Sequence, residues 1–193
     1  MRAGLLSILI LGFCFLAEGK PNNLGFSLQT GVLNGSYFGA QNGNISLAST
    51  IDLSAELVTS SRDSFFARSS MSLDPQTAII RYLYAGVGQR FYLFSRSNRQ
   101  PFEIGTSKLE VIPKMQYFVS GEAGVSQNVI QQLTSSLSVQ STSIEYGIGL
   151  GMTYPWSDGI GLTVSGGIGK GIGISAVAVD STIIRAMLGL TIK

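Results

Sequence analysis

The chain has 193 residues, of which 45% are hydrophobic and 12% are charged, and its formal net charge is +2. Charged residues make up roughly a quarter of a typical soluble domain, so an ordinary apolar content with this little charge argues against a water-soluble globule. The basic residues are scattered, and nucleic acid is excluded as a partner because its binding needs a basic stripe.

The residue types most often used for catalysis or metal binding are few. The sequence contains no histidine, the commonest general base and metal ligand in proteins. Its one cysteine, Cys14, lies in an N-terminal segment that we expect to be removed, so disulfides and thiolate metal sites are not expected. We therefore predict that the protein is not an enzyme and that it has no cofactor and no metal site.

The segment 1–19 has the layout of a secretory signal peptide. Arg2 supplies a positive start, 5–16 is an apolar run, and small residues surround Gly19. The run is shorter than the roughly 20 apolar residues that a membrane-spanning helix needs. We predict cleavage after Gly19, which leaves 20–193 as one mature domain.

Eight segments of the mature chain alternate between apolar and polar residues with a period of two, which is the pattern of half-buried strands. The clearest is 44–58. The faces of 78–94 are left open, because that segment is rich in aromatic residues and Gly86–Gly88 can hold a bulge. The eight expected strands are 24–33, 44–58, 64–73, 78–94, 108–125, 143–154, 160–169 and 182–193.

No segment after the first twenty residues is a candidate for a membrane-spanning helix. The most apolar stretch, 172–192, is interrupted by Asp180 and Arg185. A protein that crosses a membrane without helices must close its strands into a barrel, because every backbone group has to be paired internally.

The connections between the expected strands differ in length. Tight turns are expected at 60–63 and at 155–159, where Asp-Gly is a hairpin signal, and longer polar loops at 34–43 and 126–142. Short turns on one side and longer loops on the other are typical of membrane barrels. The connection 95–107 departs from this pattern, because it is long where a short turn is expected, and 171–181 fits either a loop or an extension of the strands.

The two faces of these strands differ in charge. The polar face carries acids and bases, whereas the apolar face carries almost no charge, and the chain has too few Lys and Glu residues to surround an apolar interior with a charged exterior. We therefore place the apolar face against lipid and the polar face inside, where opposite charges satisfy one another. The predicted interior charge network is Asp52, Glu56, Arg68, Glu110, Lys114, Glu122, Glu145 and Arg185. The predicted lipid-facing residues are Leu47, Ile51, Leu53, Ile148, Leu150, Leu162, Leu188 and Leu190.

These patterns predict an all-β fold, an eight-stranded antiparallel up-and-down transmembrane β-barrel. Eight strands enclose an interior about wide enough for side chains to fill. Aromatic residues near strand ends suit the two interfacial girdles of a membrane protein. The candidates for these girdles are Tyr37, Phe38, Tyr92, Phe94, Tyr154 and Trp156.

The layout resembles the small outer-membrane barrels of the OmpA-like, OmpX-like and opacity-protein group. The resemblance covers 20–193 and rests on the signal peptide, the alternating segments, the phrase Tyr84-Ala-Gly-Val-Gly-Gln-Arg-Phe-Tyr-Leu93 and the amphipathic last strand. It implies a bacterial cell outer membrane, with membrane lipid and the barrel-assembly machinery as partners and a surface ligand bound through loops. One departure is the ending Thr191-Ile192-Lys193, where such barrels usually end in an aromatic residue.

The function expected from this reading is a structural, adhesive or surface-interaction role without catalysis. Two alternatives stay open. A narrow channel or uptake barrel for small solutes needs a gap in the interior packing, which Gly147, Gly149 and Gly151 can provide. A soluble lipocalin-like binder of apolar ligands needs the apolar faces to point inward.

Overall fold

The computed structural model describes residues 24–39, 43–74, 79–93, 100–104, 107–111, 115–131, 138–157, 159–176 and 178–192, and the backbone alone at 43–47, 100–104, 107–111, 130–131 and 138–139. All regular structure in these ranges is β, and none of their residues forms a helix long and apolar enough to cross a membrane. The strands are β1 (Leu24–Gly39), β2 (Gly43–Val58), β3 (Asp63–Leu73), β4 (Ile80–Tyr92), β5 (Gln100–Ile104), β6 (Ser107–Val111), β7 (Gln116–Gln131), β8 (Ser138–Ser157), β9 (Ile160–Gly173) and β10 (Val179–Ile192).

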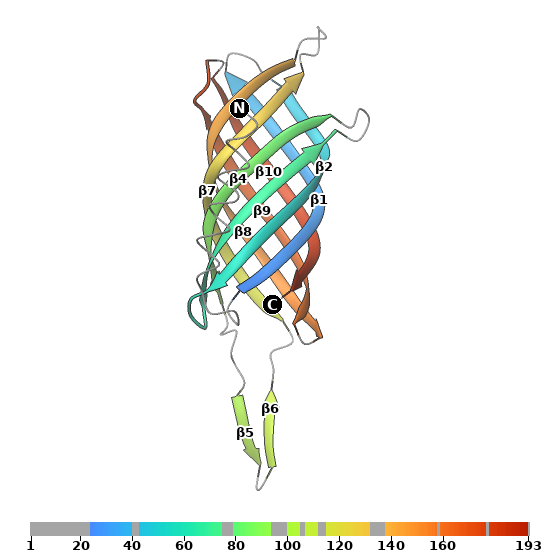
Figure 1. Ribbon diagram of the computed structural model, residues 1–193, viewed down its shortest axis with the longest axis vertical. Coiled ribbons are helices and arrows are strands. Elements are labelled where there is room, and N and C mark those ends of the chain that lie inside the picture. The colour runs from blue at the N-terminus through green and yellow to red at the C-terminus, as the bar shows by residue number, and fades with distance from the viewer. Residues whose placement is uncertain are drawn as a thin grey trace.

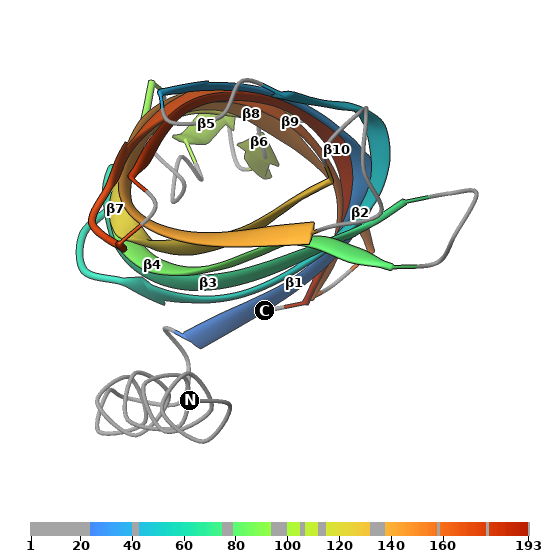
Figure 2. The ribbon, with the colours of Figure 1, turned by 90° about the horizontal axis from the view of Figure 1, so that it is seen from above.

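Eight of these strands form a closed barrel in the order β1-β10-β9-β8-β7-β4-β3-β2, and every neighbouring pair is antiparallel (Figures 1 and 2). The pairing register rises around the barrel. Following paired residues once round from Phe26 leads back to β1 at Ser36, which is ten residues further along. This displacement tilts the strands and fixes a narrow interior. The predicted fold class is confirmed.

The barrel has two different ends. We call the end that holds the start of β1, the end of β10 and the β2–β3 turn the terminal end, and the opposite end the loop end. The β2–β3 turn is tight, because Thr59 N donates to Asp63 O over 3.1 Å and Ser60 Oγ donates to the Asp63 carboxylate over 2.8 Å. At the β8–β9 turn, Gly159 has a φ of 81°, a conformation that favours glycine.

The expected fifth strand, 108–125, is wrong. Residues 107–111 form β6, which pairs with β5 in a separate two-stranded hairpin, and the barrel strand at this place is β7. The hairpin projects from the terminal end, where the C-terminus also lies (Figure 1). Pro113 stands between the two strands in sequence and has no N–H for a sheet ladder. The long connection at 95–107 thus contains β5 and the start of β6.

The expected long loops at 34–43 and 126–142 are also corrected. β1 continues to Gly39, β2 starts at Gly43, and β7 and β8 stay paired as far as Gln131 and Ser138. The ambiguous stretch 171–181 is mainly strand as well, since β9 ends at Gly173 and β10 begins at Val179. Apart from Phe38 and Ile172, the outward side chains of these extensions are mainly polar, as expected where they meet water.

Candidate functional site

The outer wall of the barrel is apolar. The predicted lipid-facing side chains that the structure describes all point outward, with exposed fractions from 37% at Leu162 to 70% at Leu150. These residues are Ile51, Leu53, Ile148, Leu150, Leu162, Leu188 and Leu190; the side chain of Leu47 lies outside the described part. A continuous apolar surface of this extent is far larger than the patches found on soluble monomers. The wall is therefore a lipid-facing surface, and we call it the apolar belt.

Both edges of the apolar belt are marked by residue type. Tyr117, Tyr154 and Trp156 are exposed near the terminal end, as expected of an interfacial girdle. At the loop end Phe38, Ile172 and Ile174 are still exposed, but polar residues now occupy many outward positions. These polar residues are Asn34, Ser36, Gln127, Gln140, Thr142, Lys170, Asp180 and Thr182.

Two of the expected girdle residues lie elsewhere. Tyr37 and Tyr92 are buried inside the barrel, because strand alternation turns them inward, and their hydroxyls donate to Asn128 Oδ1 and Glu56 Oε1. Phe38 is exposed on the wall, and Phe94 lies outside the described residues. Aromatic residues near strand ends therefore divide between the girdle and the interior.

An arginine placed in the belt tests its position. We expect Leu188→Arg, near the middle of the outward face of β10, to lower the free energy of unfolding by about 2–4 kcal/mol. Thr182→Arg, on the same face of the same strand but at the loop-end edge, is the matched control and should change it by less than about 1 kcal/mol. Unfolding by guanidinium in phospholipid vesicles measures both free energies. Equal losses of stability would contradict the position assigned to the belt.

Hydroxyl groups fill the interior near the terminal end. Thr163 Oγ1 lies 3.0 Å from Thr153 Oγ1 and 2.7 Å from Thr191 Oγ1, and Thr191 donates to Ser27 Oγ over 3.2 Å. Gln29 extends the chain, because its amide donates to Ser27 and its carbonyl accepts from Ser165. This chain links the neighbouring strands β8, β9, β10 and β1 along the inner wall of the barrel.

A second interior group is built around Arg90, which the sequence analysis missed. Its guanidinium lies 2.6 Å from Glu56 Oε2 and between the rings of Phe66 and Phe118, with 4.8 and 4.9 Å to their centroids. Glu56 also accepts hydrogen bonds of 2.6 Å from Ser64 Oγ and from Tyr92. Strand alternation could have indicated Arg90, because it turns Arg90 into the interior when its neighbours Gln89 and Phe91 point outward.

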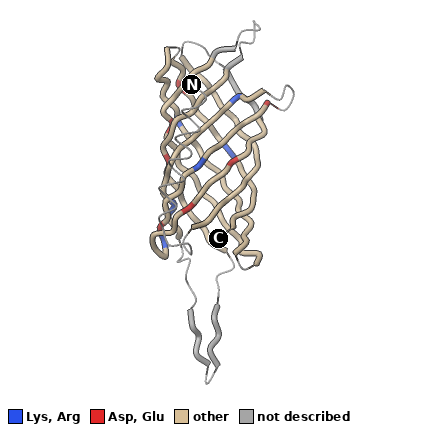
Figure 3. Tube along the Cα trace, in the orientation of Figure 1, with Lys and Arg blue, Asp and Glu red and all other residues tan. Residues whose placement is uncertain are grey.

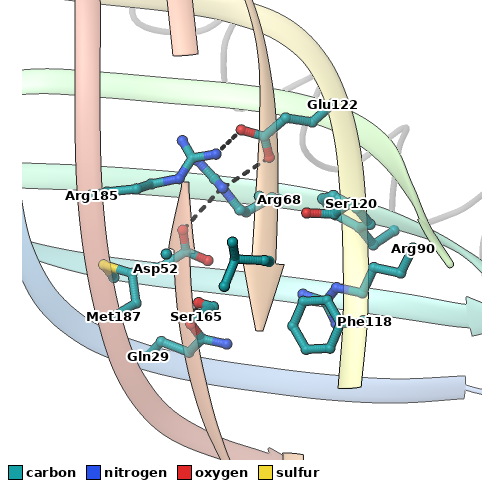
Figure 4. A pocket seen from close by; sticks show the side chains of 14 residues that line it. Gln29, Asp52, Arg68, Arg90, Phe118, Ser120, Glu122, Ser165, Arg185 and Met187 are labelled. Carbon is teal, nitrogen blue, oxygen red and sulfur yellow. Dashed lines mark hydrogen bonds and ion pairs between the residues drawn. The ribbon is translucent and has the colours of Figure 1, made fainter. Parts of the chain in front are cut away.

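The central part of the interior holds a branched ion-pair network (Figure 4), and Figure 3 marks where acidic and basic residues lie along the strands. Arg68 lies 3.0 Å from the Asp52 carboxylate and 2.8 Å from Glu122, which is also paired with Arg185. Arg185 in turn lies 4.0 Å from Glu145. Charges buried from water are stable only when paired in this way, so this network fixes the side chains that cross the barrel.

A small cavity borders the central network. Its volume is about 30 Å³, and Gln29, Phe118, Ser165 and Met187 line it together with the ion pairs. This space is large enough to admit water. Inward glycines make room for the large side chains beside it, since a Cβ at Gly151 would collide with the ring of Phe118 and one at Gly88 with Phe66.

The loop end of the interior is closed by an apolar cluster. Tyr82 and Tyr84 stack with ring centroids 6.3 Å apart, and both hydroxyl contacts of Tyr82 to the Glu145 carboxylate measure 2.9 Å. The side chains of the cluster are almost completely buried. We call this group the tyrosine plug, and its members are Leu33, Tyr37, Ala48, Tyr82, Tyr84, Val179 and Ile183.

Six of the eight residues predicted for the interior network come together in the barrel. They are Asp52, Glu56, Arg68, Glu122, Glu145 and Arg185. Glu110 is a correction: it lies in β6, outside the barrel wall, because its alternating segment pairs with β5. Lys114 lies outside the described residues, as do the segment 1–19 and Gly19. Within the described part, no group of three or more His, Cys, Asp or Glu residues is placed to hold a metal ion.

A closed eight-stranded barrel with an apolar outer wall and an ionic interior defines an outer-membrane β-barrel protein. Among solved structures, Neisserial surface protein A is similar, with a TM-score of 0.55 and 14% identity over 87% of this chain and 96% of that chain. The N-terminal β-barrel domain of Pseudomonas aeruginosa OprF has a TM-score of 0.50 and 12% identity over 86% and 96%. No family model and no curated protein sequence matches the chain. At these identities the likeness concerns the fold.

Proposed function

We propose that this protein is a sealed, non-catalytic barrel of the bacterial outer membrane, inserted by the barrel-assembly machinery, that works through surface contacts made by its loop end. The observation that carries the proposal is the combination of a closed interior with strands that continue beyond the apolar belt at one end only. The sealed interior supports a role outside the barrel, and the continuing strands supply a surface for it.

The interior supports this proposal because it has three successive layers of packed side chains. The ion-pair network and the tyrosine plug each cross the barrel, the hydroxyl chain lies along the inner wall of β8, β9, β10 and β1, and the cavity of about 30 Å³ borders the ion-pair network. A narrow channel needs a continuous water path, and a lipocalin-like binder needs an apolar interior. The packing therefore favours the sealed barrel over both alternatives.

The loop end offers a rim of paired strands that carries polar side chains beside the exposed Phe38, Ile172 and Ile174. β7 and β8 remain paired to Gln131 and Ser138, and the outward amide of Gln127 donates to Gln140 Oε1 over 3.4 Å. Paired strands hold such side chains in fixed positions, which lowers the entropy lost on binding a partner. A polar, pre-ordered rim suits adhesion or another surface contact.

The proposal that the protein is not an enzyme rests on its acids and on its lack of histidine. The carboxylates of Asp52, Glu56, Glu122 and Glu145 are each paired with an arginine or a tyrosine inside the barrel. Carboxylates held in a closed interior do not meet a substrate, and the sequence offers no imidazole as general base.

Epitope insertion tests the orientation that the proposal requires. A short tag between Gln131 and Ser138 should be labelled by antibody on intact cells, whereas the same tag in the β2–β3 turn at 59–62 should be labelled only after the outer membrane is permeabilised. The tagged proteins should fractionate with the outer membrane and shift in gel mobility on heating. Labelling in the reverse pattern, or recovery as a soluble periplasmic protein, would refute the proposal.

A further inference from the structure

Gln89 is a polar residue inside the apolar belt. Strand alternation turns it outward on β4, where it is exposed, while its neighbour Arg90 points inward. The outward apolar residues around it on the same stretch are Phe91 and Leu93 toward the terminal end and Val87, Ala85 and Leu83 toward the loop end. Leu93 is four residues away, which is about 13 Å along an extended chain. Asp63, an outward acid on β3, pairs with Phe91 and is nearer, so Gln89 lies close to the terminal-end edge of the belt.

The amide of Gln89 has no hydrogen-bond partner among the described residues. A polar group in hydrocarbon is unfavourable unless it is hydrogen-bonded, because lipid tails offer neither donors nor acceptors. Thr30, another outward polar residue in the belt, shows the usual solution, since its hydroxyl donates to Thr50 O in the neighbouring strand over 3.2 Å. For Gln89, a partner from outside the chain can take this role.

The wall beside Gln89 is low on its β7 side, where the partner of Gln89 is Gly121 and a Cβ built on that glycine meets no atom within 4 Å. On the β3 side the partner of Gln89 is Phe65, which is 51% exposed and borders the low area. Ala123 follows Gly121 on the same face of β7, and Ala67 faces Val87 from β3. On β8, Ile148 and Leu150 are 65% and 70% exposed and form a ridge along one side of this shallow face.

We propose that a second copy of this chain binds to this face, with the β3–β4–β7 walls of the two barrels in contact and the two Gln89 amides hydrogen-bonded to each other. An amide carries both a donor and an acceptor, so two copies of one glutamine satisfy each other. The small residues around Gly121 let the walls approach closely enough for this contact, as small residues do between membrane-spanning helices.

The membrane itself favours the second copy. Two copies in one bilayer have the same orientation, so their symmetry axis lies along the membrane normal and residues at equal depth meet. Gln89 is then brought opposite Gln89 of the other copy. The contact lies on the wall and leaves the loop-end rim free, so the inference rests on the membrane embedding of the proposed function and on none of its surface contacts.

Single-cysteine cross-linking in native membranes tests this arrangement. In a Cys14→Ser background the chain has no other thiol, so Gln89→Cys is a unique site. Ala186→Cys is the matched control. Ala186 also points outward and has a glycine, Gly166, as its cross-strand partner, but it lies on β10, on the opposite side of the barrel. With a short bifunctional thiol reagent we expect at least ten-fold more dimer from Gln89→Cys than from Ala186→Cys.

Two further variants test whether the Gln89 amide and the low face at Gly121 cause the association. Gln89→Leu removes the amide and Gly121→Leu fills the low face, and each should lower the dimer fraction several-fold in energy-transfer measurements between labelled copies in vesicles, while Ala186→Leu should not. Equal cross-linking at both cysteines, adducts with other proteins in place of the dimer, or unchanged association of Gln89→Leu would overturn the inference. Labelling of both cysteines by a lipid-soluble maleimide reports membrane embedding separately, so a failed dimer is distinguishable from a failed barrel.

Discussion

Replacement of Arg90 by methionine should lower the free energy of unfolding by about 3–5 kcal/mol, the loss usually seen when one partner of a buried ion pair is removed. Arg90 is ion-paired with Glu56 over 2.6 Å, and both side chains are buried. Without it, the carboxylate keeps its hydrogen bonds from Ser64 and Tyr92 but loses its counter-charge. The rings of Phe66 and Phe118 also lose the guanidinium that lies between them.

The second replacement in a double-mutant cycle separates charge from packing. Glu56→Gln removes the negative charge and keeps a carbonyl that accepts from Ser64 and Tyr92. The variant with both Arg90→Met and Glu56→Gln should therefore be more stable than Arg90→Met alone, by about 1–3 kcal/mol. The single tryptophan, Trp156, reports unfolding by fluorescence during guanidinium titration in vesicles.

The control for this cycle is an exposed acid. Asp180 lies on the outside of β10, and its carboxylate accepts from Gly173 N over 3.2 Å. Asp180→Asn keeps an acceptor there and should change the free energy of unfolding by less than about 0.5 kcal/mol. A change below about 1 kcal/mol for Arg90→Met would show that the pair contributes little, as exposed ion pairs do.

Opening of the barrel to ions should need two layers to be removed together. We expect the natural protein to show no steady conductance in planar bilayers, because the ion-pair network and the tyrosine plug close the interior in series. Arg68→Ala with Glu122→Ala removes one charge of each sign from the network. Tyr82→Ala with Tyr84→Ala removes the stacked rings of the plug.

Either pair of substitutions alone should leave the barrel closed, and all four together should produce conductance. Heat-dependent gel mobility verifies that each variant is folded before it is recorded. Steady conductance of the natural protein would favour the channel alternative instead. Conductance after the network substitutions alone would show that the tyrosine plug does not seal the loop end.

Strands with a simple division of residue types were predictable from the sequence. In β2, and in β10 from Ile184 to Ile192, most outward positions are aliphatic and most inward positions are small, polar or charged, so the period of two gives both the strand and its faces. Six of the eight network residues lie in such strands. The ion-pair partners of these residues were not predictable, because the alternation within a strand does not specify which strands lie beside or opposite it.

β4 shows why the rest escaped prediction. Tyr82, Tyr84 and Tyr92 point inward while Phe91 points outward, so aromatic residues occur on both faces and the alternation is hidden. A tyrosine suits either environment, because its ring packs in an apolar cluster and its hydroxyl finds a partner. The tyrosine plug and Arg90 both depend on the faces of this strand.

The error at 108–125 has a different physical origin. The sequence 107–111 alternates between polar and apolar residues as clearly as a barrel strand does. These residues pair with β5 in a local hairpin and do not join the barrel. Hydrophobic periodicity reports that a segment is extended and two-faced, and it does not report which sheet the segment joins. Glu110 was placed in the interior for that reason.

Closure of the barrel depends on the pairing of β1 with β10, the first and last strands of the chain. Until β10 is in place, the other seven strands form an open sheet whose two edges expose unpaired N–H and C=O groups, a state prone to join other chains. Such a contact between distant parts of the sequence also forms slowly, because a long loop must be closed first. The nascent protein therefore depends on protection of β1 from the moment of its synthesis to the docking of its last strand.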